Sequence, residues 1–265
     1  VSSGTLNLNT GSTLSLNALV LGGTLSGTDS VTVANSFDWS NGTISTSTFE
    51  TLSGSTTNIT GDDARIFDTV WNSRGTINWI GDGGIYDQFF QQGSAVFNNI
   101  GTFNDLTNAT NYGLLGNSSS SVVNNIGTWN KLGSSPNSHV TASTFNNTGI
   151  VNISSKSILL TTDGTDTGAY NTTGTGLLEL VSGTRTFSNT ASISGDLLTR
   201  NGGDFTFSGS TLALSSYSQS ASTVILNSGT SFSVSNDLVT VSSGTLNLNT
   251  GSTLSLNALV LGGTL

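Results

Sequence analysis

Apolar and polar residues alternate along most of this chain. In the stretch GTLNLNTGSTLSLN, the apolar side is formed by Leu6, Leu8, Leu14 and Leu16, and Thr, Ser and Asn fill the positions between them. Because successive side chains of a strand point to opposite faces, a period of two predicts strands with one buried face. No ten-residue window shows a convincing 3.6-residue period, so we expect an all-β fold.

Strand-like pieces also recur along the chain at a nearly constant spacing. Most begin with Gly, at positions 4, 23, 42, 75, 101, 127, 149, 176 and 203, and others lie at 53–61 and 222–229. About eleven coils of about 22 residues then fill 240 residues, which is within the range of solenoid repeats. We therefore predict a parallel β-solenoid of the right-handed β-helix type. The alternative is an array of immunoglobulin-type sandwiches, but the hallmark buried Trp and Cys pair of that fold are missing.

A much longer repeat encloses this short one. Residues 1–25 and 241–265 both read VSSGTLNLNTGSTLSLNALVLGGTL, an offset of 240 residues. We interpret residues 1–240 as one solenoid unit and residues 241–265 as the start of the next identical unit, continuous with the same solenoid. A tandem array of this kind favours a structural protein over an enzyme.

One motif stands out in the middle of the unit: an apolar or aromatic residue, Asn, two variable residues and Gly. We predict that its leading residues stack inside the solenoid, one per coil: Trp71, Phe97, Val123, Phe145 and Tyr170. Asn tolerates the backbone of turns, and stacked amides can hydrogen-bond from coil to coil. The residues that follow are therefore predicted to form a ladder where the chain turns: Asn72, Asn98, Asn124, Asn146 and Asn171. The alternative is that these residues attach glycans or bind a ligand.

The strings (F/V)NNxGTxN and SGTLxLxxGSTLxL resemble repeats of β-helical passenger and fibre regions in large bacterial surface proteins. Filamentous-haemagglutinin-like adhesins and autotransporter-associated β-strand repeats are examples, and the resemblance covers most of the chain. It implies secretion to the cell surface or extracellular space, a long rod, and a role in adhesion or biofilm matrix. We expect a structural fibre whose partners are further copies of itself. The alternative is an adhesin or carbohydrate-binding module that binds surface glycans.

Composition narrows the choice of partners. Only 8% of residues are charged, the net charge is −9, and the six basic residues are spread singly. A nucleic-acid partner is therefore not expected, because such partners require clustered positive charge. No apolar run reaches the ~18 residues of a transmembrane helix, so we expect no membrane span in this segment. The chain has no Cys, which excludes disulfides and cysteine-based metal sites.

Candidate chemistry is sparse. The densest carboxylates, Asp62 and Asp63, lie in a Gly-Asp-Asp string that also occurs in β-helical pectin hydrolases. Those enzymes need further acids, a His and a basic substrate motif, whereas this chain has a single His (His139) and no such motif. We expect a turn there, no catalytic residues and no enzymatic activity. Asp163 and Asp166 of DGTDTG could hold Ca²⁺ through oxygen ligands, although a plain turn is the simpler interpretation; no other cofactor is expected.

The segment GDGGIYDQFFQQGS, residues 81–94, is the longest insertion between motif copies. Its aromatic residues interrupt the strand pattern, and insertions in solenoids often emerge on the binding face. The segment either covers the core or forms a sugar-binding loop with Tyr86, Phe89 and Phe90. Ice binding would require a regular Thr-x-Thr rank, but the expected outward residues mix Thr, Ser and Asn.

Overall fold

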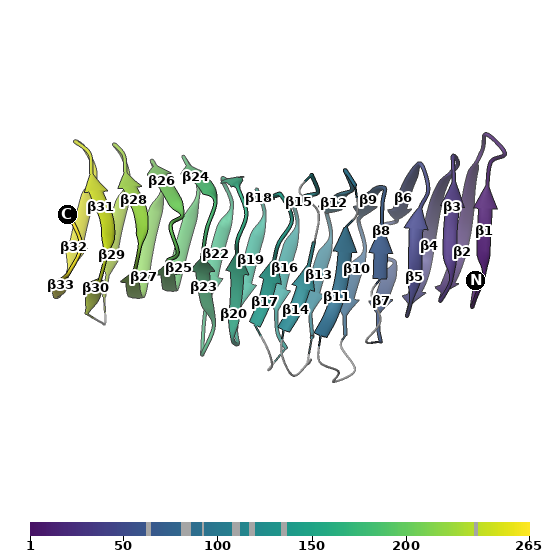
Figure 1. Ribbon diagram of the computed structural model, residues 1–265, viewed down its shortest axis with the longest axis horizontal. Coiled ribbons are helices and arrows are strands. Elements are labelled where there is room, and N and C mark those ends of the chain that lie inside the picture. Colours follow the sequence, from purple (N-terminus) through teal and green to yellow (C-terminus); the bar gives the residue numbers. More distant parts are fainter. Residues whose placement is uncertain are drawn as a thin grey trace.

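The structure is a computed structural model. It describes residues 1–61, 65–80, 86–91, 93–107, 112–116, 120–133, 137–235 and 238–265, with the backbone alone at 86–88, 90 and 112–114. Within these residues there are 33 strands and no helix. The strands lie side by side along one long axis, with the N-terminus and the C-terminus at opposite ends (Figure 1). All strand pairings between neighbouring coils are parallel, which confirms the predicted parallel β-solenoid.

The strands form three parallel ladders, which we call A, B and C in the order in which the chain visits them. Ladder A consists of β1 (Thr5–Leu8), β3 (Thr24–Gly27), β5 (Gly42–Ser45), β8 (Arg65–Phe67), β11 (Tyr86–Gln91), β14 (Tyr112–Leu115), β17 (Asn137–Val140), β20 (Ser157–Leu160), β23 (Leu177–Leu180), the second halves of β25 (Ser192–Thr199) and β27 (Thr211–Gln219), β30 (Val239–Val241) and β33 (Leu259–Leu261).

Ladder B consists of the first halves of β2 (Thr13–Leu21) and β4 (Ser30–Trp39), then β6 (Thr48–Thr51), β9 (Val70–Ser73), β12 (Val96–Asn99), β15 (Val122–Asn125), β18 (Thr144–Asn147), β21 (Gly164–Asp166), β24 (Thr184–Ser188), β26 (Asp204–Ser208), β28 (Ser222–Leu226) and β31 (Gly244–Leu248). Ladder C consists of the second halves of β2 and β4, then β7 (Thr56–Ile59), β10 (Thr76–Trp79), β13 (Thr102–Asp105), β16 (Thr128–Lys131), β19 (Ile150–Ile153), β22 (Ala169–Thr172), the first halves of β25 and β27, β29 (Ser231–Val234) and β32 (Thr253–Leu256).

Each turn of the solenoid contributes one segment to each ladder. Following ladder A from β1 to β30 takes eleven steps, so the prediction of about eleven coils per 240 residues is confirmed. Where one strand serves two ladders, it bends at a shift in register. In β25 this bend falls at Gly195, whose φ of 91° lies in the left-handed region that glycine adopts without a steric penalty.

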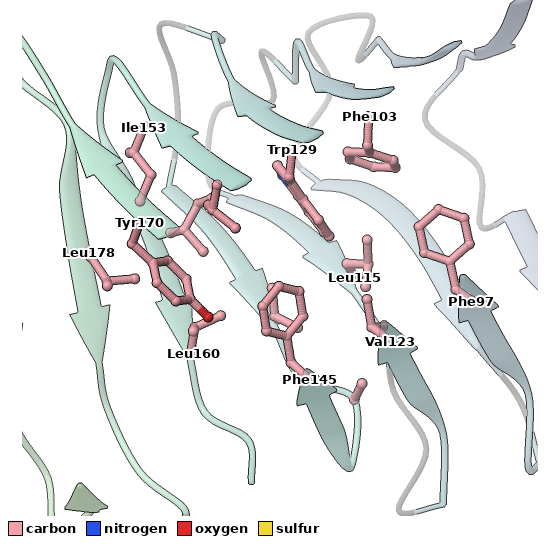
Figure 2. Packing of buried hydrophobic residues seen from close by; sticks show 14 of the residues in the cluster. Phe97, Phe103, Leu115, Val123, Trp129, Phe145, Ile153, Leu160, Tyr170 and Leu178 are labelled. Atoms are coloured by element: carbon pink, nitrogen blue, oxygen red, sulfur yellow. The ribbon is translucent and has the colours of Figure 1, made fainter. Parts of the chain in front are cut away.

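The core runs along the axis between the three ladders. Most strands alternate one partly exposed and one buried residue, as the period of two predicts. Figure 2 shows buried side chains from several strands pointing into the space between the ladders. The rings of Phe97 and Phe103 come from ladders B and C, with centroids 5.8 Å apart, and those of Phe103 and Trp129 are 4.4 Å apart on neighbouring coils. Such pairs stabilise a core by about 0.5–1.5 kcal/mol beyond the burial of their area.

Candidate functional site

The outward side of ladder C carries a continuous row of asparagines. Each Nδ2 donates to Oδ1 of the asparagine one coil nearer the N-terminus, at 2.9–3.2 Å, along Asn58, Asn78, Asn104, Asn130, Asn152 and Asn171. At the N-terminal end, Asn58 Nδ2 donates to Asp38 Oδ1 at 2.9 Å, and at the other end the Ser194 hydroxyl donates to Asn171 Oδ1 at 3.0 Å. Asp38 thus stands at the acceptor end of the row, and every amide of the row donates toward it.

A second outward row lies on ladder B. Asn98 donates to Asn72 at 2.8 Å, Asn124 to Asn98 at 2.8 Å, and Asn146 to Asn124 at 2.9 Å. The row ends where the backbone N–H of Thr165 donates to Asn146 Oδ1 at 3.0 Å.

The predicted ladder differs from these rows in two respects. Its first four members lie within strands β9, β12, β15 and β18, not where the chain turns. Its fifth member, Asn171, belongs to the row on ladder C, since it follows Tyr170 in β22. In the next coil the motif copy that starts at Tyr170 lies on ladder C, in β22. Thr165 therefore occupies the place on ladder B that an asparagine fills in the coils before it. The leading residues Trp71, Phe97, Val123, Phe145 and Tyr170 are all buried, the first four on ladder B.

A third row, which the sequence analysis missed, lies inside the solenoid on ladder B. Asn99 Nδ2 donates to Asn125 Oδ1 at 2.7 Å, and Asn125 Nδ2 donates to Asn147 Oδ1 at 2.8 Å. The three amide nitrogens also donate to carbonyls on ladder C, at Thr128, Ile150 and Ala169, and so tie the two ladders together. The alternation in the sequence could have indicated this row. The second Asn of FNN lies two residues after the buried Phe, and residues two apart in a strand point to the same face.

The inner row ends at a buried ion pair. Nη2 of Arg185 lies 2.8 Å and 2.7 Å from the two carboxylate oxygens of Asp166, which also accepts the Tyr170 hydroxyl at 2.7 Å. The backbone N–H of Asn147 donates to the same carboxylate at 3.2 Å. Burial raises the pKa of Asp166, and the neighbouring Arg185 charge opposes that rise. Burial also holds the pKa of Tyr170 well above its ordinary value. The carboxylate is therefore enclosed by donors and is fully removed from solvent.

A second buried pair lies on ladder C, next to ladder A. Lys131 Nζ is 3.3 Å from Asp105 Oδ1, and both side chains are fully buried. The remaining acceptor capacity of Asp105 is used by the hydroxyls of Thr107 at 2.7 Å and Ser138 at 2.5 Å. Both buried pairs are fully enclosed and bond to neighbouring coils, so they hold coils together and have no face open to a ligand; Nε of Arg185 is left without a hydrogen-bond partner.

The other predicted site residues are not brought together. Residues 86–91 of the possible binding loop form a strand, β11, and Phe89 is fully buried with its ring centroid 5.5 Å from that of Phe97, so this residue covers the core and does not line a binding surface. The side chains of Tyr86 and Phe90, and all of Asp62 and Asp63, lie outside the described residues.

The two acids proposed as Ca²⁺ ligands point to opposite sides of the wall. Asp166 points inward to Arg185, whereas Asp163 is exposed and accepts the backbone N–H of Thr184 at 2.8 Å. Among the described residues no three acidic or His side chains gather as a metal site would need, and no pocket is found there. None of the described segments forms an apolar helix of membrane-spanning length.

Comparisons with protein-family models, with curated proteins and with solved structures give no match for this chain. The architecture alone therefore defines the class. The chain is a β-solenoid protein with three parallel ladders, a continuous apolar core and hydrogen-bonded asparagine rows on both sides of its wall.

Proposed function

We propose that this chain is a segment of an extracellular structural rod built from tandem 240-residue solenoid units. The observation that carries the proposal is the identical 25-residue segment, which forms the same coil at both places. Thr5 pairs with Thr24, and Thr245 pairs with Thr264. The sequence thus specifies this coil wherever it occurs, as a unit that is repeated along an array requires.

The same bonds recur in detail. The N–H of Gly22 donates to the carbonyl of Val1 at 2.7 Å, and the N–H of Gly262 donates to that of Val241 at 2.7 Å. Parallel neighbouring strands are about 4.8 Å apart, so a unit of about eleven coils adds roughly 53 Å of rod. Because all three ladders run through the chain, each added unit would extend one core instead of building a separate domain.

The resemblance of the repeated strings to fibre regions of bacterial surface proteins supports the location and the class of role. It favours a secreted cell-surface or matrix rod, structural and not catalytic, whose main partners are further copies of itself. The outward rows support this role, because neutral amides bonded from coil to coil line two sides of the rod without clustered charge.

Small-angle X-ray scattering on chains of one, two and three units tests the proposal. The expected result is a cross-section that stays constant while length rises by about 53 Å per unit. A string of separate globular bodies on flexible connections would contradict it. Deleting one whole coil, residues 97–122, from the single-unit chain provides a control, since it should shorten the rod by about one strand spacing, ~4.8 Å.

A carbohydrate-binding role is the second candidate, and the outward row on ladder C favours it. Each asparagine in that row uses one N–H and one lone pair within the row, which leaves a second N–H and a second lone pair free for sugar hydroxyls. A glycan array probed with the single unit would test this. Specific binding that is lost in Asn104→Ala and retained in the ladder B variant Asn124→Ala would establish a binding face on ladder C. Equal binding by both variants would contradict it.

A further inference from the structure

The two copies of the identical 25-residue segment lie on different ladders. Thr5–Leu8 forms β1 of ladder A, whereas the same letters at 245–248 lie in β31 of ladder B. The next strand shifts in the same sense, because residues 13–16 are on ladder B and residues 253–256 are on ladder C. Residues 19–21 are on ladder C, and their counterparts 259–261 are on ladder A. All three parts of the segment are therefore displaced by one ladder.

The pairing between the two ends of the segment recurs at both places, so the displacement is one of phase. Eleven steps of ladder A lead from β1 to β30, and the repeated segment begins one ladder later, in β31. A separation of 240 residues thus corresponds to eleven and one third turns. Each ladder change is about a third of a turn around the axis.

The composition of the segment explains why it fits any ladder. Residues 1–25 contain no charged side chain, and the inward positions of their strands are mostly Leu. At the second place, Leu246 is fully buried in register with Val224. Apolar side chains need volume and not a specific partner, so the segment can pack on whichever ladder it reaches. By contrast, Asp166 needs Arg185 and is fixed to one position.

We propose that the tandem array is a threefold screw, in which each 240-residue copy is rotated by one third of a turn relative to the copy before it. This inference rests on the tandem array proposed above. Three copies then make 34 turns and restore the starting orientation after roughly 160 Å, using about 4.8 Å per turn. The outward row that one copy carries on ladder C would continue on ladder A in the next copy and on ladder B in the third.

The screw defines how a second rod would meet the first. Every outward row recurs on all three sides of the array, once in three copies. A neighbouring rod of the same protein can therefore make the same contact from three directions.

The phase can be measured in the 265-residue chain by pairs of nitroxide spin labels, because the chain has no native Cys. Thr223 and Thr245 are register partners on ladder B, so Thr223→Cys with Thr245→Cys should give strong spin exchange. A whole number of eleven turns would instead place residue 245 on ladder A, the ladder that holds Ser218 and its register partner Thr240. The pair Ser218→Cys with Thr245→Cys should therefore show none.

The pair Ser218→Cys with Thr240→Cys is the positive control, since these two residues are register partners on ladder A. Single-label variants with the circular dichroism of the parent chain show that the labels leave the fold intact. Exchange in the 218–245 pair and not in the 223–245 pair would overturn the rotation. A three-unit chain examined by electron microscopy separates this result from the parent proposal. A straight rod whose copies all face one side would refute the screw and keep the rod, whereas a string of separate bodies would refute the rod.

Discussion

Ladder B carries asparagines on both sides of one wall, and the two rows differ in what surrounds them. Asn124 points outward and is partly exposed, whereas its neighbour Asn125 points inward and is fully buried. Both bond to asparagines one coil away, at 2.7–2.9 Å. The outer row donates toward the N-terminus and the inner row toward the C-terminus. The bonds along the two rows are therefore alike in length, and the rows differ in donor direction, in access of water and in the bonds that the inner amides make to ladder C.

This difference determines what each row contributes. Water can replace a lost partner in the outer row, but an inner amide that loses its partner stays unsatisfied in a medium of low dielectric. The inner amide of Asn125 also donates to the Ile150 carbonyl on ladder C. The outer row thus adds modest stability, and the inner row adds more stability and ties ladder B to ladder C.

The largest effect is expected where the inner row ends. Replacing Arg185→Met leaves the buried Asp166 carboxylate without its cation, which costs about 3–5 kcal/mol in comparable cases. Urea unfolding followed by circular dichroism measures the change. The double variant Arg185→Met with Asp166→Leu is the matched control and should recover part of the loss, because no charge then remains buried while the Tyr170 hydroxyl and the Asn147 N–H lose their acceptor. A single variant as stable as the parent would show that this end of the row contributes little.

The inner row itself comes next. In Asn125→Ala, the Asn147 carboxamide oxygen and the Ile150 carbonyl lose their donor, and we expect a loss of about 1–3 kcal/mol in the free energy of unfolding. Hydrogen exchange of the strands β15 and β18 should report the same loss locally. A change no greater than that of the adjacent outward variant would remove the distinction between the rows.

The sequence predicted the solenoid and its interior well but placed the polar rows less well. Alternation identified Phe97 and Val123 as inward residues, because every second residue of a strand points to the same face and the apolar face is the buried one. The motif gave no information on which ladder each copy would reach, since that depends on the lengths of all preceding coils. Tyr170 and Asn171 therefore lie on ladder C. The pair formed by Arg185 and Asp166 spans 19 residues in different motifs, so no local pattern could have indicated it.

The outer row should respond less. Asn124→Ala breaks two amide bonds at a partly exposed position, where water takes over the partners. We expect a loss of about 0.5–1 kcal/mol in the free energy of unfolding, in line with the net value of a hydrogen bond that solvent can replace. The measurement is the same urea titration, run beside the inner variant. A loss of several kcal/mol would mean that the outer row is as inaccessible to water as the inner one.

The smallest effect is expected from His139, which lies on ladder A and is partly buried. Burial lowers the pKa of its imidazole, with Glu179 opposing and Arg200 adding to the shift. The folded chain then favours the neutral ring, so the unfolded chain binds more protons below its pKa of 6.5. Stability should fall as the pH drops through 6.5 and on toward 5. His139→Gln should lose this part of the pH dependence while keeping the part that comes from carboxylates, because His139 is the chain's single His. The test is the free energy of unfolding of the parent chain and of His139→Gln, plotted against pH between 7.5 and 5. Parallel curves would show that the imidazole is as well solvated in the folded chain as in the unfolded chain.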